Sequence, residues 1–403
     1  MCASALSNVK VLDLTWMVGL PYATAWLADH GAQVVHLESI TRPDGNRMFP
    51  PAKDNKPGLN RGTSFAGFNR NKYGAALDLS TPKGRDIARK LIAWADIFAE
   101  SFPPELMKKW GLTYEEVVKI NPNIIMVASN MQGQYGPASS LPGFGTQLGG
   151  LSGFAYVNGW PDRAPITSMA YTDCVAPIST TIAMVAALDW RKRTGKGQFL
   201  DVSQLETSLH FLAPIFLDYS ANGRIATRVG NRCDFAAPHG IFRCLGDDRW
   251  CAIAVFTEQE WKSLCQVMGE PEWTKNEKFA THLGRKANED ELESLVELWT
   301  RNLPPEEVMY ALQSANVAAG VVRNNEDLFQ CPQLKSRGYY WTLHHPEIGE
   351  YRCEAPPFKL SKTPAQPQRP GPCLGEHSEL VYTSFLGMSD EEFVDLVQEG
   401  VIK

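Results

Sequence analysis

The segment Val9-Lys10-Val11-Leu12-Asp13-Leu14 decides the fold, because it is short, apolar and rich in β-branched residues. It is followed by a helix-length stretch over residues 21–30 with proline in its first turn. Gly31-Ala32 then breaks into a second apolar run, Gln33-Val34-Val35-His36-Leu37. A strand, a crossover helix and a strand in so few residues predict a βαβ unit, and hence a parallel sheet with helices on its faces.

The same alternation continues along the chain. Further strands are expected at residues 75–79, 96–99, 124–128 and 198–202, and helices at 82–94, 104–110, 114–120, 174–191 and 203–219. Residues 132–160 are rich in glycine and aromatic residues, and they predict loops with one short helix. The chain is therefore expected to form an open, Rossmann-like α/β sheet, a class that binds ligands beyond its strand ends.

The character of the sequence changes after about residue 221. A β-hairpin is expected over residues 240–255, followed by helices at 258–268, 290–300 and 305–315. From residue 332 the chain is rich in proline and strand-like, and it ends in a helix over 389–399. We therefore predict a large α/β domain at 1–224, a smaller α+β domain at 225–325, and a C-terminal segment at 326–403 that returns to the large domain.

Charge and cysteine usage limit the possible partners. The 403 residues include 39 Lys and Arg against 45 Asp and Glu, a formal net charge of −6, which argues against nucleic acid or an anionic membrane as a partner. The nine cysteines form no C-x-x-C pair, so no metal site is expected. Scattered thiols and an N-terminus without features of a secretion signal favour a cytoplasmic protein.

Familiar nucleotide and hydrolase motifs are missing. The turn Thr15-Trp16-Met17-Val18-Gly19-Leu20-Pro21 holds one glycine, so it does not fit the G-x-G-x-x-G dinucleotide fingerprint. The sequence contains neither a phosphate loop ending in Gly-Lys-Ser/Thr nor a Gly-x-Ser-x-Gly elbow. A dehydrogenase, a P-loop NTPase and an α/β-hydrolase are therefore disfavoured.

One acidic residue has two possible roles. Asp173 lies in Ala170-Tyr171-Thr172-Asp173-Cys174, just before the apolar helix. An aspartate at this place most often caps the helix. A carboxylate beside a glycine-rich loop and a helix N-terminus could instead be a positioned nucleophile.

A set of short motifs carries a family resemblance through their order and spacing. They occupy residues 11–14, 21–24, 27–35, 69–72, 77–85, 95–102, 193–198 and 374–378. In this order the chain resembles the class III coenzyme A (CoA) transferases, the formyl-CoA transferase or CaiB/BaiF family. The resemblance covers nearly the whole chain.

The resemblance implies an activity and an assembly. In the family an aspartate attacks an acyl-CoA thioester to give a mixed anhydride, and CoA thiolate then converts it to an aspartyl-CoA thioester. An acceptor carboxylate takes up the CoA in the later steps. Asp173 falls on the nucleophile position. The family fold is a dimer of interlocked chains, so a homodimer or heterodimer is implied, with CoA thioesters as substrates and no permanently bound cofactor.

The resemblance also implies a CoA-binding surface. The turn after the first strand, here Trp16, Met17, Val18 and Gly19, lies along CoA; the family often has His and Gln there, which Trp16 and Val18 replace. Lys72 matches a lysine near the CoA phosphates.

Three further positions complete that surface. Phe102 matches an aromatic residue of the adenine region, and Lys109 matches a cation for phosphate. Ser39 stands where the family often has arginine, so Arg42 or Arg47 is expected to supply that charge.

The substrates and two alternatives remain open. Residues 142–154 resemble a branch that moves CoA from succinyl-CoA to aromatic or branched acids such as benzylsuccinate. An acyl-CoA racemase shares the fold but generally needs a histidine in the glycine-rich loop, and Gly143-Phe144-Gly145 has none. A non-catalytic subunit of a heteromeric transferase is the third possibility.

Overall fold

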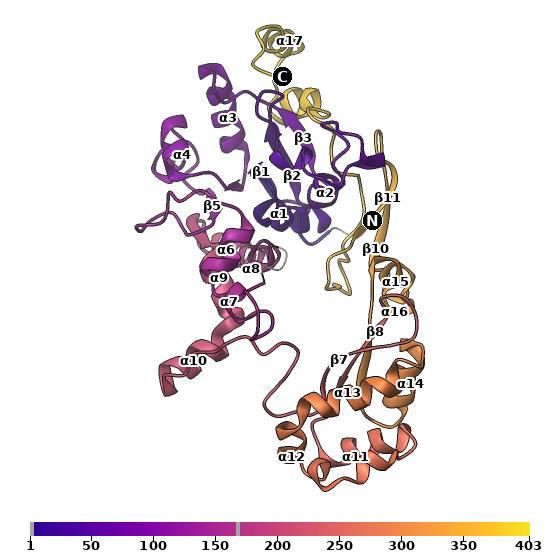
Figure 1. The fold of residues 1–403 in the computed structure, drawn as a ribbon. Helices are drawn as coiled ribbons and strands as arrows, with labels where there is room; N and C mark the ends of the chain where they lie inside the picture. The colour runs from indigo at the N-terminus through magenta and orange to yellow at the C-terminus, as the bar shows by residue number, and fades with distance from the viewer. Residues whose placement is uncertain (1–3, 167–169) are drawn as a thin grey trace. The chain divides into compact units, whose positions relative to one another are not determined.

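A six-stranded parallel sheet organises the larger part of the molecule. The computed structural model describes residues 4–166 and 170–403, and the strands lie in the order β3-β2-β1-β4-β5-β6. Their bounds are β1 (Lys10–Leu14), β2 (Gln33–Glu38), β3 (Tyr73–Ala76), β4 (Ile97–Glu100), β5 (Ile125–Asn130) and β6 (Gln198–Ser203). Figure 1 labels β1, β2, β3 and β5 of this sheet. The predicted α/β class with a parallel sheet is confirmed. Because the strand order reverses between β1 and β4, a crevice is expected outside their carboxyl ends.

Alternating residues of the strands bury two apolar layers. Leu12 and Leu14 of β1 pack in one cluster with residues of α3 (Pro82–Trp94) and α5 (Tyr114–Ile120). Val11 points to the other face and packs with residues of α1 (Gly19–Asp29) and α8 (Tyr171–Thr194). This alternation is the period of two expected for a strand that is buried on both faces.

Shorter helices complete this part of the chain. They are α2 (Thr63–Phe68), α4 (Pro104–Trp110), α6 (Gly145–Leu151), α7 (Phe154–Val157), α9 (Gln204–Leu209) and α10 (Ala213–Asn222), with 3-10 turns η1 (Gly45–Arg47), η2 (Lys53–Asn55) and η3 (His210–Leu212). The expected single helix at 203–219 is therefore wrong, since α9 and α10 are separate. Pro214 in the first turn of α10 has no backbone N–H, which explains a new helix start there.

The strand predicted at 75–79 is β3 (Tyr73–Ala76), which begins two residues earlier and ends three residues earlier than predicted. Its last pairing brings Ala76 opposite Glu38 of β2. Asp78 N instead donates to Val401 O at 2.9 Å, so the C-terminal segment draws the backbone out of the sheet.

The chain divides into two compact units. The larger one comprises the described residues up to 155, together with 170–225 and 335–403; the smaller one comprises 156–166 and 226–334. The smaller unit holds the antiparallel sheet β7-β8-β9, in which β9 was not expected. Its elements are β7 (His239–Arg243), β8 (Trp250–Ala254), α11 (Glu258–Val267), η4 (Glu272–Lys275), η5 (Glu277–Phe279), α12 (His282–Ala287), α13 (Glu289–Thr300), α14 (Pro305–Ser314), β9 (Ala318–Val322) and α15 (Asn325–Gln330), before α16 (Pro332–Ser336) leads out of it.

The C-terminal segment covers the edge strand β3. His377 N donates to Gly74 O at 2.8 Å, and the Tyr382 hydroxyl donates to Ala76 O at 2.7 Å. Figure 1 shows the yellow C-terminal segment beside the indigo sheet. This segment holds β10 (Tyr340–His345), β11 (Gly349–Glu354), the π-helix η6 (Leu380–Phe385) and α17 (Asp390–Gln398). An edge strand covered in this way presents no free ladder to another chain.

Among the described residues, α8 is the one helix that is long and apolar enough to cross a membrane by length and composition. The core helix of a soluble protein passes the same test. Here α8 packs against α1 and buries Val175, Met184 and Ala187, and it carries Pro177 in its interior.

A fully buried ion pair joins the centre of the sheet to the loop before β3. The Lys72 ammonium lies 2.7 Å from Asp13 Oδ2, and it also donates to Pro21 O and Asn69 Oδ1, each at 2.8 Å. Asp13 accepts another hydrogen bond from the Thr24 hydroxyl of α1 at 2.8 Å. Burial opposes the charge of Asp13, but the positive charge of Lys72 holds the pKa of its carboxyl well below the usual range. The pair therefore fixes β1, α1 and the approach to β3 together.

We expect Lys72→Met to destabilise the protein by about 3–5 kcal/mol, because it leaves the Asp13 carboxylate buried without a counter-charge. The measurement is the free energy of unfolding in urea. Lys90→Met is the control, since it breaks an exposed ion pair with Glu392 and should change stability by about 1 kcal/mol or less. The double variant Asp13→Asn/Lys72→Met should recover much of the loss. Wild-type stability of Lys72→Met would contradict this account.

Candidate active site

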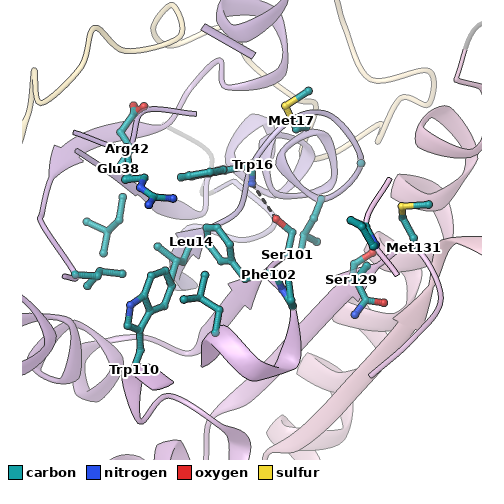
Figure 2. Close-up of a pocket in the computed structure, with 18 of the residues that line it drawn as sticks. Leu14, Trp16, Met17, Glu38, Arg42, Ser101, Phe102, Trp110, Ser129 and Met131 are labelled. Atoms are coloured by element: carbon teal, nitrogen blue, oxygen red, sulfur yellow. Dashed lines mark hydrogen bonds between the residues drawn. The ribbon is translucent and has the colours of Figure 1, made fainter. Parts of the chain in front are cut away.

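A cavity of about 800 Å³ lies at the carboxyl edge of the parallel sheet. Its walls come from residues just after β1, β2, β4 and β5, and Figure 2 shows side chains from these strand ends around it. This is the place that the reversal of strand order between β1 and β4 predicts for a ligand. All of the lining residues belong to the larger unit.

The turn after β1 forms one wall and is held rigidly. Trp16 N donates to Ser101 Oγ at 2.9 Å, the contact dashed in Figure 2. Met17 has a φ of 71°, a left-handed conformation that a methionine rarely adopts. Its N–H donates to Asp44 Oδ1 at 3.0 Å, and its carbonyl accepts from Asn46 Nδ2 at 3.1 Å. Strain held by buried side chains in this way is typical of functional sites.

The predicted turn residues all line the cavity. Trp16, Met17, Val18 and Gly19 contribute to its wall. Asp44, which was not predicted, is buried beneath them, and burial raises the pKa of its carboxyl to about 6. The sequence offers little indication that Asp44 belongs to the site, because its partner Met17 lies 27 residues away.

Aromatic rings and cations line another part of the cavity. Phe102 contacts Trp16 and Trp110 edge-to-face, at centroid distances of 4.9 and 5.3 Å. Lys109 and Arg42 also line the cavity, and both are exposed. Among the described residues neither forms an ion pair. Flat apolar rings beside free cations suit a heteroaromatic group that carries phosphates.

Of the two candidate arginines, Arg42 lines the cavity and Arg47 does not. The Arg47 guanidinium is fully buried, donates to Glu38 Oε2 at 2.8 Å, and lies 3.6 Å from the centroid of the Phe65 ring. Arg42 is the one that faces the cavity. Arg85, which was not predicted, lines it too, with its guanidinium donating to the carbonyls of Leu79 and Ser80.

The prediction that Lys72 lies near CoA phosphates finds no support in the cavity lining. Its side chain is fully buried, and its ammonium donates to three internal acceptors, so it faces the core and does not line the cavity. The sequence gives no sign that Lys72 is buried, because an Asn-Lys pair in a polar loop is ordinarily exposed to solvent. Its buried partner, Asp13, lies 59 residues earlier in the chain.

Asp173 lies in the same cavity. A crossover helix runs opposite to the parallel strands it connects, so the N-terminus of α8 lies at their carboxyl edge. Asp173 is the third residue of α8, whereas Ala170 occupies the cap position and makes no side-chain cap bond. The capping role is therefore wrong, and the carboxylate is directed elsewhere.

The Asp173 carboxylate packs directly against Gly145, the first residue of α6. A Cβ added at Gly145 would lie 2.4 Å from both Asp173 Oδ2 and Ala170 Cβ, so a larger residue there would have to displace these neighbours. Burial raises the pKa of Asp173 to about 6, and no charge among the described residues offsets that effect. The carboxylate makes no hydrogen bond within the described part of the chain. A desolvated, unpaired carboxylate facing a cavity can act as a nucleophile.

Two further polar residues at this edge escaped sequence analysis. Gln204 lines the cavity from the start of α9. Glu100 ends β4, and its Oε2 accepts from Phe102 N at 2.8 Å, while burial raises the pKa of its carboxyl to about 8. Gln204 directly follows β6 and Glu100 ends β4. Their position at the end of a strand was the feature of the sequence that could have indicated a role in the site.

Comparisons with known proteins agree with this geometry. The model of CoA-transferase family III matches residues 6–378. The chain is 29% identical over 398 residues to the succinyl-CoA–D-citramalate CoA-transferase of Chloroflexus aurantiacus, covering 98% of each chain. It is 28% identical to the succinyl-CoA:glutarate CoA-transferase of Homo sapiens, covering 98% of this chain and 90% of that one.

A subunit of a heteromeric enzyme and a solved structure are also similar. The chain is 30% identical to the beta subunit of succinyl-CoA–L-malate CoA-transferase of Chloroflexus aurantiacus, covering 98% of each. The crystal structure of a CaiB/BaiF family protein from Brucella suis matches with a TM-score of 0.87 and 28% identity, covering 95% of this chain and 100% of that one. The predicted family is thus confirmed: the chain belongs to CoA-transferase family III and is an enzyme of that family.

Proposed function

We propose that this enzyme transfers CoA from an acyl-CoA donor to a carboxylic acid through covalent intermediates on Asp173. The observation that carries the proposal is the Asp173 carboxylate, which has no ion pair among the described residues and faces a cavity that also presents Arg42 and Lys109. A nucleophile and a cationic region in one cavity fit the two ends of an acyl-CoA molecule.

The chemistry proceeds through carbonyl additions. Asp173 Oδ adds to the thioester carbon, the carbonyl π pair moves to oxygen, and collapse breaks the C–S bond to release CoA thiolate and leave a mixed anhydride. The thiolate then attacks the aspartyl carbonyl, which releases the donor acid and leaves an aspartyl-CoA thioester. The acceptor carboxylate attacks that thioester, which breaks its C–S bond, expels CoA thiolate and forms a second mixed anhydride. The thiolate then attacks the acceptor carbonyl of this anhydride, which gives the acceptor acyl-CoA and frees the Asp173 carboxylate. Partial burial of Asp173 supports this reading, because anhydrides hydrolyse readily in water.

Binding of CoA follows from the same cavity. Phe102 and Trp110 would contact the adenine, Arg42 and Lys109 the phosphates, and the turn of Trp16 to Gly19 the pantetheine arm. Arginine and lysine are the side chains that hold phosphates best. The thioester would then reach Asp173.

The donor and the acceptor acid are proposed from the substrates that the relatives are named for. Relatives named for succinyl-CoA support that donor, and their named acceptors are citramalate, glutarate and malate. An aromatic acceptor such as benzylsuccinate stays a prediction without support from these relatives. Its one structural argument is that Met17, Met131 and Phe144 give the cavity apolar walls. An acceptor panel with succinyl-CoA decides between them.

The assembly is proposed to be a homodimer, or a heterodimer with a related subunit. Ile182 of α8 and Leu217 of α10 are 65% and 68% exposed, and Ile178, Val185, Phe216 and Tyr219 are exposed as well. Exposed apolar residues gathered on helices are typical of subunit interfaces. A particle of 44.7 kDa in light scattering, the mass of one chain, would contradict the proposal.

Neither alternative function has a specific observation in its favour. A racemase would use a histidine in the glycine-rich loop, and Gly143-Phe144-Gly145 offers none. A non-catalytic subunit would not need a desolvated carboxylate in the cavity.

Asp173→Asn is expected to abolish covalent labelling and transfer, because an amide is not a nucleophile here. After incubation of the wild type with succinyl-CoA, mass spectrometry should find a CoA adduct on the peptide that contains Asp173, and hydroxylamine should remove it. Asp189→Asn, an exposed residue of the same helix, is the control and should label normally. Transfer at the parental rate by Asp173→Asn would overturn the proposal.

The rate of adduct formation should fall about tenfold per pH unit below about pH 6. Burial raises the pKa of Asp173 to about 6, and protonation below that value removes the nucleophilic form. Rapid quenching with succinyl-CoA from pH 5 to 8 measures the profile. Asp44→Asn is the control, because the pKa of Asp44 is also raised to about 6. If the acid limb vanishes in Asp44→Asn, it does not report on Asp173.

Gly145→Ala should slow adduct formation by about 100-fold or more, because the new methyl group displaces the Asp173 carboxylate. Gly149→Ala is the matched control: it makes the same change on the same helix, and a Cβ there meets no atom within 4 Å. Single-turnover labelling of both variants measures the difference. Equal rates would show that the packing of Gly145 against Asp173 has no catalytic consequence.

A further inference from the structure

Gln204, the first residue of α9, is a mostly buried polar residue. It is 9% exposed, and its carboxamide makes no hydrogen bond to any residue in the described part of the chain. Only its backbone carbonyl is engaged, by the hydroxyls of Thr207 and Ser208. The carboxamide atoms are not among the fully buried unpartnered atoms, so they are accessible from the cavity that Gln204 lines and can bond to a ligand there.

The carboxamide is directed into the cavity beside the turn after β1. Gln204 lines the cavity, and a Cβ added at Gly19 would lie 2.6 Å from Gln204 Nε2. Glycine at position 19 therefore leaves room for this side chain. Gly19 belongs to the turn along which the proposed function places the pantetheine arm.

The backbone brings Gln204 and Asp173 to the same edge of the sheet. Gln204 directly follows Ser203, the last residue of β6, and Ser203 is paired with Asn130 at the end of β5. Asp173 lies in the first turn of α8, which packs on α9 and on α6. Both residues line the one cavity.

Several other polar groups of the cavity are already engaged. Ser101 Oγ accepts from Trp16 N, Asn130 Oδ1 accepts from Gly133 N, and the Arg85 guanidinium donates to two carbonyls. Trp16 Nε1, Ser129 Oγ, Asn130 Nδ2 and the Gln204 carboxamide belong to the neutral donors of this cavity that have no partner among the described residues. Of these four residues, Gln204 is the one carried by α9, a helix that packs against α8, which bears Asp173, and against α6. Each acyl-transfer step at Asp173 generates an oxyanion, which needs such a donor.

We infer that Gln204 Nε2 donates a hydrogen bond to the carbonyl oxygen of the acyl group that Asp173 attacks. The inference rests on the proposed function. As the Asp173 Oδ–C bond forms and the π pair moves to oxygen, this hydrogen bond strengthens; it is kept while the C–S bond breaks and CoA thiolate leaves. No proton is transferred to or from Gln204, so the carboxamide can serve every carbonyl addition of the cycle unchanged.

Gln204→Leu should lower the rate of adduct formation by about 100- to 1000-fold, the usual effect of removing one oxyanion donor. The Kd of succinyl-CoA should change by only a few-fold, because the bond is strongest in the transition state. Gln266→Leu, the same change at an exposed glutamine of α11, is the control and should act like the wild type.

Gln204→Glu separates an oxyanion role from a packing role. Glutamate has nearly the shape of glutamine, so a packing role predicts that it is tolerated better than leucine. A donor role predicts that it is at least as harmful as leucine, because a carboxylate repels the developing oxyanion. Circular dichroism should show that all three variants are folded.

A ground-state measurement avoids dependence on the rate. Succinyl-CoA with a ¹³C label at the thioester carbonyl is bound to Asp173→Asn, which cannot react, and its infrared stretch is recorded. Adding Gln204→Leu should shift that stretch to higher frequency as the hydrogen bond is lost. An unchanged stretch, together with wild-type labelling by Gln204→Leu, would overturn the role of Gln204. Normal transfer by Asp173→Asn would instead overturn the proposed function.

Discussion

The buried contact between Lys72 and Asp13 is the interaction on which the site depends. Desolvating two charges is costly, and the cost is offset here because the ammonium has three acceptors and the carboxylate has hydroxyl donors as well. The pair lies at the end of β1, one residue before its last. It therefore fixes the strand, the helix that follows and the loop before β3 at the point where the chain turns into the cavity.

The wall of the cavity is built outward from this anchored strand. The turn after β1 is held in an unfavourable backbone conformation by Asp44 and Asn46, and Ser101 ties it to the end of β4. Asp44 N in turn donates to Glu38, which is paired with Arg47. Asp44, which holds the turn, is thus fixed in place by Glu38 and Arg47. The cavity wall is therefore preorganised before any substrate binds.

The sequence revealed those features that depend on local pattern. Short apolar runs identified the strands of the sheet, because most of them are buried on both faces. The place of Asp173 before a helix favoured a capping role, and the family resemblance indicated the nucleophile. Features that depend on distant partners were missed. The resemblance placed Lys72 near CoA phosphates, because nothing nearby in the sequence indicates its buried partner Asp13. Gln204 was hidden because a glutamine that begins a helix is unremarkable until its surroundings are known, and the break between α9 and α10 was overlooked although Pro214 marks it.

The charges of the cavity are arranged in a way that suits a carboxylate nucleophile. An aspartate paired with a cation would have a low pKa and correspondingly weak basicity, and nucleophilicity falls with basicity. Burial does the opposite for Asp173, which has no counter-charge among the described residues: its pKa rises to about 6, so it stays ionised at neutral pH while being more basic than a solvated aspartate. Arg42 and Lys109 are among the lining residues, yet neither contributes to the pKa of Asp173. The cavity can therefore hold anionic phosphates without quenching the nucleophile. A neutral donor such as Gln204 suits the reacting end for the same reason, since it can stabilise an oxyanion without pairing permanently with the carboxylate that creates it.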